Sequence, residues 1–180
     1  MDVWTIALDA PRAVILSTEE QARAARFHFE RDRIHWTHAR SALRAILATY
    51  VNAPAGDLRF VYGPHGKPAV DGVEFNMSHS RGWALIAVTR DVPVGVDLEV
   101  IRENVDIAKL LRRIGETDLP ESTRELFHAW TRREAKTKAS GGALMERPAG
   151  DVCVVDIDAP EGFAASLALR GFEPEVRYRS

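Results

Sequence analysis

The hydrophobic pattern divides the chain into segments with the two-residue period of strands and segments with the longer period of helices. Residues 3–8 alternate between two sets of side chains, which predicts a half-buried strand at the start of the chain. Short apolar runs bounded by turn residues predict more strands between residues 58 and 100 and again after residue 151. The dipeptides Asp71-Gly72 and Arg81-Gly82 lie where hairpin turns are needed.

Helical segments lie before and after the first group of strands. Ser17, with Glu20 three residues later, forms a capping box that opens a first helix. Apolar residues at helical spacing predict further helices over residues 31–51, 107–114 and 122–140, the last ended by Gly141 and Gly142.

The order of helices and strands repeats along the chain, which predicts an α+β fold made of two similar α+β halves. We expect the halves to cover residues 1–91 and 92–180 and to pack directly together, because no flexible linker separates them.

Composition narrows the class of protein. Apolar residues make up 46% and charged residues 28% of the 180 residues, as in ordinary globular proteins. The net charge of −2 gives no bulk attraction to nucleic acid or to an anionic membrane surface. The chain has no signal peptide pattern and no apolar run near the ~20 residues of a membrane helix, so we expect a cytoplasmic protein.

Two carboxylates project from one predicted strand. In the run VGVDLEV, Asp97 and Glu99 share the face opposite to the apolar one. Adjacent like charges are stabilised by a hard cation such as Mg²⁺. The alternative is an exposed edge strand with solvated acids.

The last long helix carries a mixed group of charges. Trp130, Glu134 and Lys138 recur every four residues and line one face, with Arg133 beside them. A carboxylate and several cations next to a tryptophan suit a site that holds a metal and a polyphosphate. The alternative is an ordinary glutamate–lysine pair on a solvated helix.

Other candidate phosphate-binding residues lie nearer the N-terminus. The segment GPHGKP predicts a tight turn that presents Lys67, and Ser78 and His79 end a strand just before a turn. Arg40 and Arg44 lie on one face of the helix 31–51, together with Arg33; a solvated helix face is the alternative for these arginines.

The segments GPHGKP, FNMSHS, GVDLE and WTRREAKTKASG follow one another in an order and spacing that resembles the 4′-phosphopantetheinyl transferases of the surfactin-synthetase type. The resemblance extends over most of the chain. It implies a fold of two halves related by a pseudo-twofold axis, with coenzyme A between them.

The resemblance also implies the reaction. Members of this family transfer the 4′-phosphopantetheine group of coenzyme A to a serine of an apo acyl or peptidyl carrier protein and release adenosine 3′,5′-bisphosphate. By this resemblance the catalytic residues are Glu134, as the base, and Lys138, and the metal ligands are Asp97, Glu99 and Glu134, which would hold Mg²⁺. Coenzyme A would be bound by Arg40, Arg44, Lys67, Ser78, His79, Arg133 and Lys138.

The chain departs from the family pattern in three places. Arg133 stands where the motif has lysine, and Lys136 stands where an aromatic or aliphatic residue is usual. The stretch between Glu99 and Trp130, which helps to receive the carrier protein, is shortened. A relative that binds coenzyme A or a carrier protein without transfer is therefore the alternative function. We expect the protein to be a monomer.

Overall fold

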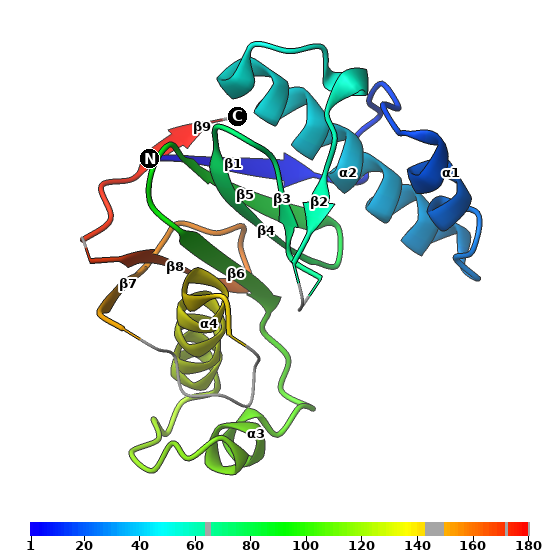
Figure 1. Cartoon of the computed structure of the whole chain (residues 1–180). Coiled ribbons are helices and arrows are strands. Elements are labelled where there is room, and N and C mark those ends of the chain that lie inside the picture. The colour runs from blue at the N-terminus through cyan, green and yellow to red at the C-terminus, as the bar shows by residue number, and fades with distance from the viewer. Residues whose placement is uncertain (64–65, 143–149, 172, 180) are drawn as a thin grey trace.

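Two β-sheets form the centre of the molecule, each covered on its outer face by a long helix (Figure 1). The computed structural model describes residues 1–63, 66–142, 150–171 and 173–179. The first sheet has the order β4-β5-β1-β9, and the second has the order β6-β8-β7. The strands are β1 (Asp2–Ala7), β4 (Glu74–Ser80), β5 (Trp83–Thr89), β6 (Val94–Val100), β7 (Val152–Asp156), β8 (Phe163–Arg170) and β9 (Arg177–Arg179).

The helices form where the apolar spacing predicts them. Ser17 closes a capping box at the start of α1, and Gly141 ends α4 in the left-handed conformation at φ 73°. The helices are α1 (Thr18–Ala24), α2 (Glu30–Val51), α3 (Ile107–Arg113) and α4 (Thr123–Ser140), and a 3₁₀ turn covers Ala55–Asp57. No helix in the described residues is both long and apolar enough to cross a membrane.

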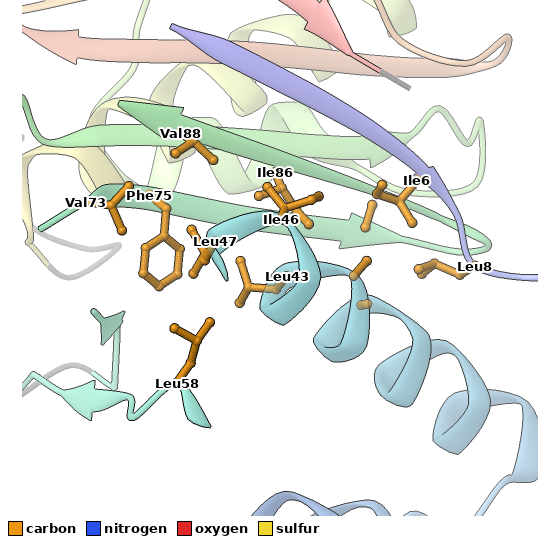
Figure 2. Close-up of a cluster of buried hydrophobic side chains, with 13 residues drawn as sticks. Ile6, Leu8, Leu43, Ile46, Leu47, Leu58, Val73, Phe75, Ile86 and Val88 are labelled. Atoms are coloured by element: carbon orange, nitrogen blue, oxygen red, sulfur yellow. The ribbon is translucent and has the colours of Figure 1, made fainter. Parts of the chain in front are cut away.

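The two sheets pack face to face, so β1 is covered on both sides. Ile6 and Leu8 point toward α2, where they join Leu43 and Leu47 in one core cluster (Figure 2). Val3 points the other way, into a second cluster that contains apolar residues of β6 and β8. The prediction that this strand is half-buried is therefore wrong, because a whole second sheet covers the face that the alternation left to solvent.

The strands of the second sheet also place alternate residues on opposite layers. Val96 and Leu98 of β6 face the first sheet, and Asp97 on the same strand faces α4. From outside to outside, the layers are α2, the sheet β4-β5-β1-β9, the sheet β6-β8-β7 and α4 (Figure 1). This arrangement agrees with the predicted α+β class. The pseudo-twofold relation of the halves stays a prediction.

The C-terminal strand crosses between the predicted halves. β9 pairs in parallel with β1, with Asp2 opposite Arg177, and thus belongs to the sheet of the N-terminal half. The backbone amide of Arg177 donates to the carbonyl of Met1 over 2.9 Å, and both Arg177 and Arg179 form ion pairs with Asp2. The predicted C-terminal half, residues 92–180, therefore contributes one strand to the sheet of the N-terminal half.

The predicted turns occupy their expected places. Arg81 adopts φ 53° between β4 and β5, and Gly72 adopts φ 80° in the turn before β4. A small separate sheet of β2 (Val61–Tyr62) and β3 (Pro68–Ala69) carries the turn before Lys67. The Gly66 amide donates to the Gly63 carbonyl over 2.9 Å there; Pro64 of the same predicted turn lies outside the described residues.

Candidate active site

Strand β4 holds the carboxylate strand β6 through side chains, although the two strands belong to different sheets. Asn76, Ser78 and Ser80 alternate along β4 and all reach β6. Ser78 Oγ donates to Asp97 Oδ1 over 2.9 Å, and Ser80 Oγ donates to Glu99 Oε2 over 3.2 Å. The segment FNMSHS thus places both predicted metal ligands at the junction of the two sheets.

Helix α4 brings an ammonium group to the same point. Lys138 Nζ lies 2.6 Å from Asp97 Oδ1, and it also donates to Ser78 Oγ over 3.3 Å and to the carbonyl of Val96 over 3.2 Å. The helix can approach so closely because β6 has a glycine at this level: a Cβ on Gly95 would lie 2.0 Å from the carbonyl oxygen of Ala135. Three segments far apart in the sequence therefore meet at Asp97.

Three carboxylates share this site. Burial raises the pKa of Glu99, and the charge of Asp97 raises it further. Burial also raises the pKa of Glu134; Lys138 lowers it, and the charges of Asp97 and Glu99 raise it again. The predicted ligands Asp97, Glu99 and Glu134 thus lie near enough to influence these pKa values, and the charge of Lys138 acts in the opposite direction on Glu99 and Glu134.

The chemistry of these donors fits a hard divalent cation. All three offer carboxylate oxygens, which Mg²⁺ prefers. Asp97 Oδ2 is buried and has no hydrogen-bond partner among the described residues, which is a costly state that a cation would relieve. The described carboxylates are not gathered closely enough to form a ready three-ligand group, and Lys138 holds the other oxygen of Asp97. The fit therefore requires a small side-chain rearrangement.

His79, which follows Ser78 on β4, lines a cavity of about 550 Å³. Partial burial of its ring lowers the pKa of His79, and the charges of Lys138 and His35 lower it further, so the neutral imidazole is favoured. Arg23 and Arg81 line the same cavity with Trp36, whose ring stacks under the Arg23 guanidinium at 5.4 Å. Sequence reasoning missed these residues because they come from α1, α2 and a hairpin turn that meet only in the fold.

Lys67 lies between the halves and does not bind the carboxylates. Its Nζ donates to the carbonyls of Val94 and Lys138 over 3.3 and 3.2 Å. Burial lowers its pKa; the charge of Glu74 opposes this effect. The lysine thus contacts the last turn of α4, where the helix dipole favours a cation. Its role in phosphate binding stays a prediction.

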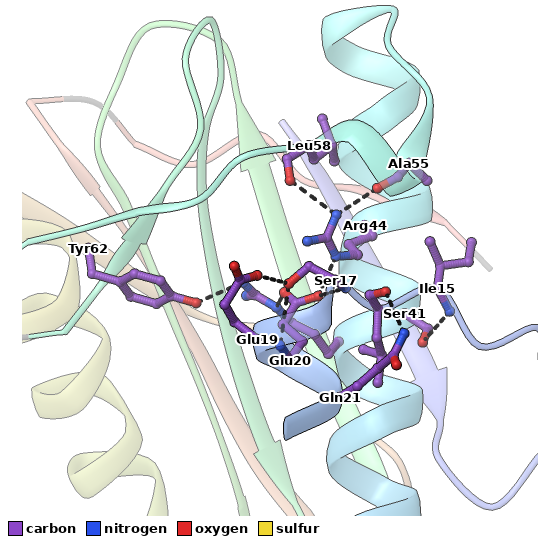
Figure 3. Close-up of polar contacts among 12 residues, drawn as sticks. Ile15, Ser17, Glu19, Glu20, Gln21, Ser41, Arg44, Ala55, Leu58 and Tyr62 are labelled. Atoms are coloured by element: carbon purple, nitrogen blue, oxygen red, sulfur yellow. Dashed lines mark hydrogen bonds and ion pairs between the residues drawn. The ribbon is translucent and has the colours of Figure 1, made fainter. Parts of the chain in front are cut away.

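Arg40 and Arg44 lie away from the carboxylate cluster, and Figure 3 shows Arg44 together with Glu20. They are 5% and 2% exposed, and both pair with Glu20, the capping-box residue of α1. Arg40 also donates to the Tyr62 hydroxyl over 2.9 Å, and Arg44 donates to the Leu58 carbonyl over 3.1 Å. These guanidinium groups hold α1 and the segment after α2 against α2, so the geometry does not favour their predicted role in binding coenzyme A.

Arg133 points to another side of α4. Its Nη1 lies 3.8 Å from Glu116 Oε1, and it lines a cavity of about 410 Å³ with Arg132 and Lys136. Both departures from the family motif, at 133 and 136, therefore line this cavity, which includes neither Asp97 nor Lys138. The predicted contact of Arg133 with coenzyme A is left as a prediction.

A carboxylate cluster that contains an ammonium group, in a fold that also has an arginine-lined cavity, is typical of enzymes that act on phosphate esters and anhydrides.

Comparison with known proteins gives the family. The N-terminal model of the 4′-phosphopantetheinyl transferases matches residues 4–91. The chain is 36% identical over 165 residues to the 4′-phosphopantetheinyl transferase HetI of Nostoc sp., which covers 80% of this chain and 70% of HetI. It is 32% identical over 118 residues to AcpT of Salmonella typhimurium, which covers 59% of each protein. The chain belongs to the 4′-phosphopantetheinyl transferase family.

The finer prediction, the surfactin-synthetase type, has weaker support. Sfp of Bacillus subtilis is 25% identical over 164 residues, which covers 80% of this chain and 72% of Sfp. HetI is therefore more similar to this chain than Sfp is.

Proposed function

We propose that the protein transfers the 4′-phosphopantetheine group of coenzyme A to a serine hydroxyl of an apo carrier protein and releases adenosine 3′,5′-bisphosphate. The observation that carries this proposal is the cluster of Asp97, Glu99, Glu134 and Lys138 in a chain of this family. The relatives bear the name of this transferase, and the cluster has the charges that the reaction needs.

The carboxylates of Asp97, Glu99 and Glu134 would hold Mg²⁺. When bound, the ion neutralises negative charge on the pyrophosphate and on the leaving phosphate. Lys138 lies within the same cluster, so its ammonium group can leave Asp97 and bind a phosphate oxygen as coenzyme A arrives. The orphaned oxygen of Asp97 supports a cation in addition to this lysine.

Glu134 has the properties of a base for the carrier serine. Burial and the neighbouring carboxylates raise its pKa, which brings the carboxylate closer to the proton affinity that proton transfer near neutral pH requires. The serine oxygen that loses this proton attacks the β-phosphorus of coenzyme A. The bond from that phosphorus to the oxygen bridging the two phosphates breaks, and the bisphosphate leaves with that oxygen.

The cavity beside His79 is our candidate for the nucleotide end of coenzyme A. Arg23 and Arg81 supply positive charge for phosphate, and the aromatic rings of Trp36 and Phe27, 5.8 Å apart, offer apolar surface for a base. His79 lines this cavity and is close enough to Lys138 for the lysine charge to lower its pKa, so we propose that one extended ligand occupies the cavity and reaches Lys138.

Helix α3 offers a surface for the carrier protein. Lys109, Leu110 and Arg112 are exposed on it, so a positively charged surface with one apolar contact faces solvent. Such a surface suits an acidic partner segment. The short connection between β6 and α4 places this helix at the end of α4 that lies away from Lys138 (Figure 1).

The decisive experiment incubates the protein with coenzyme A, Mg²⁺ and a panel of apo acyl and peptidyl carrier proteins, and measures carrier mass. We expect at least one carrier to gain one phosphopantetheine group. Glu134→Gln abolishes the gain, and Glu125→Gln, an exposed change in the first turn of the same helix, does not. If no carrier gains mass while the protein binds coenzyme A, the protein is a binding relative and not a transferase.

A further inference from the structure

Helix α4 lies on the sheet β6-β8-β7 through very small residues. Gly95, Ala135, Ala139 and Ala168 are all buried at this interface. Such residues let the helix and the sheet approach closely, but they form no ridges that would fix the helix along its axis. Besides the packing of Phe127 with Ala164 of β8, a polar interaction is therefore needed at this small-residue interface to set how far α4 extends over the sheet.

Four polar residues, which we call the α4 link, supply this interaction. Thr131 Oγ1 of α4 lies 2.8 Å from Ser166 Oγ of β8, and both residues are fully buried. Ser166 Oγ lies 2.9 Å from Asp156 Oδ1 of β7, and Arg132 of α4 binds the same carboxylate with two nitrogens. Two successive helix residues are thus tied to two strands.

Elementary chemistry gives the direction of these hydrogen bonds. Ser166 has one hydroxyl proton and donates it to the Asp156 carboxylate, the strongest acceptor within reach. Thr131 must then donate to Ser166. Without that acceptor, Thr131 can turn to the carbonyl of His128 at 3.1 Å, so loss of the bond need not leave a buried group unsatisfied.

The link lies in the same row of the sheet as the active-site carboxylate. Asp97, Ser166 and Asp156 are directly opposite one another on β6, β8 and β7. Neighbouring strands lie only about 4.8 Å apart. Glu134 follows Thr131 by three residues, which is less than one helical turn. The row that presents Asp97 therefore also holds the helix that presents Glu134.

We propose that Thr131 and Ser166 are positioning residues: their hydrogen bond fixes the axial position of α4 and thereby places Glu134 beside Asp97 and Glu99 for cation binding and proton transfer. This role rests on the proposed function of the carboxylate cluster. It acts through Glu134, since neither hydroxyl is free to touch the substrate.

The test compares two changes at one position. Thr131→Val keeps the size of the side chain and removes the hydroxyl, whereas Thr131→Ser keeps the hydroxyl. Thr137→Val is the matched control, because Thr137 is 4% exposed on the same helix and its hydroxyl donates only to the Arg133 carbonyl of that helix. For each protein, calorimetry measures the affinity for Mn²⁺ as the probe cation, and the carrier assay measures kcat and the KM for coenzyme A.

We expect Thr131→Val to weaken Mn²⁺ binding by about 10-fold or more, as loss of a supporting contact behind a metal ligand does. We expect its kcat to fall at least as much, with the KM for coenzyme A little changed. Thr131→Ser and Thr137→Val stay close to the wild-type protein in both measurements.

Equal losses in the valine and serine variants, or a lower melting temperature with unchanged Mn²⁺ affinity and kcat, would overturn the positioning role. A wild-type protein that binds no Mn²⁺ also contradicts it, because no cation site would remain for the link to support. A wild-type protein that binds Mn²⁺ but modifies no carrier contradicts the proposed function alone, and the Mn²⁺ comparison still decides the role of Thr131.

Discussion

The replacement Gly95→Ala tests whether the close approach of α4 to β6 sets both stability and activity. The new Cβ would lie 2.0 Å from the Ala135 carbonyl oxygen and 2.6 Å from the Ala139 nitrogen. Both are backbone atoms inside a helix, so no flexible side chain can move aside. The helix would have to retreat by roughly 1 Å in a close-packed interior.

The magnitude follows from two opposing effects. Overpacking of a tight interior costs about 1 to 3 kcal/mol, and backbone contacts belong at the upper end. The alanine stiffens the unfolded chain, which offsets about 0.4 to 1 kcal/mol. We therefore expect a net loss of about 2 kcal/mol, or roughly 4 to 8 °C in melting temperature for a chain of this size.

The effect on activity should exceed the effect on stability. Glu134 and Lys138 lie on the helix that must retreat, and a displacement of about 1 Å at reacting groups can cost on the order of 100-fold in rate. Urea unfolding and the carrier-modification assay, both at 20 °C, measure the two losses. Gly56→Ala is the control, because a Cβ there meets nothing within 4 Å. If Gly95→Ala is as stable and as active as Gly56→Ala, the close approach does not set the site.

Two further predictions concern stability. Burial raises the pKa of the Glu20 carboxyl, but hydrogen bonds from two arginine side chains and a backbone amide lower this pKa on balance. The contribution of the Glu20 carboxylate to stability is therefore present above the unfolded pKa and is lost as pH falls through the folded pKa. Glu20→Gln should thus cost more stability at pH 7 than near pH 3 in urea unfolding, whereas the exposed change Glu161→Gln should give no such pH dependence. Asp2→Asn weakens the ion pairs of Asp2 with Arg177 and Arg179 of β9 and should lower the free energy of unfolding by about 1 to 3 kcal/mol. Asp91→Asn, a surface change, is the control. Equal free energies of unfolding for the two variants would show that the two ion pairs contribute nothing to stability.

Local rules predicted the elements of this fold because each signal was contained in a few neighbouring residues. The capping box at Ser17 and the left-handed Gly141 both involve a single helix end. The alternation that put Asp97 and Glu99 on one face of a strand is likewise local, and the structure keeps both on the face opposite to Val96 and Leu98, where each accepts a hydrogen bond from a serine of β4.

The partners of those elements were beyond local rules. Arg40 and Arg44 do lie on one face of α2, as helical periodicity predicts. Periodicity does not show which group lies opposite that face, and in the structure both arginines form ion pairs with Glu20 of α1. The three-residue strand β9 has too little pattern to reveal that it crosses to the N-terminal sheet. The register of β6, β8 and β7, which aligns Asp97 with Ser166, depends on pairing across more than sixty residues.

The positions of individual charged residues in the fold are more informative about the site than the net charge. A net charge of −2 gives no bulk attraction to a charged partner, and it hides a segregation of charge within the fold. Lys138 binds the buried Asp97, and Lys67 donates to the carbonyl of Lys138 in the last turn of the same helix, so two of the four lysines of the chain lie at this end of α4. Like charges in a low dielectric repel strongly, so three neighbouring carboxylates need a compensating cation. The ammonium group of Lys138, 2.6 Å from Asp97 Oδ1, supplies part of this compensation, and the second oxygen of Asp97, which has no hydrogen-bond partner among the described residues, is the atom at which we propose that a cation binds.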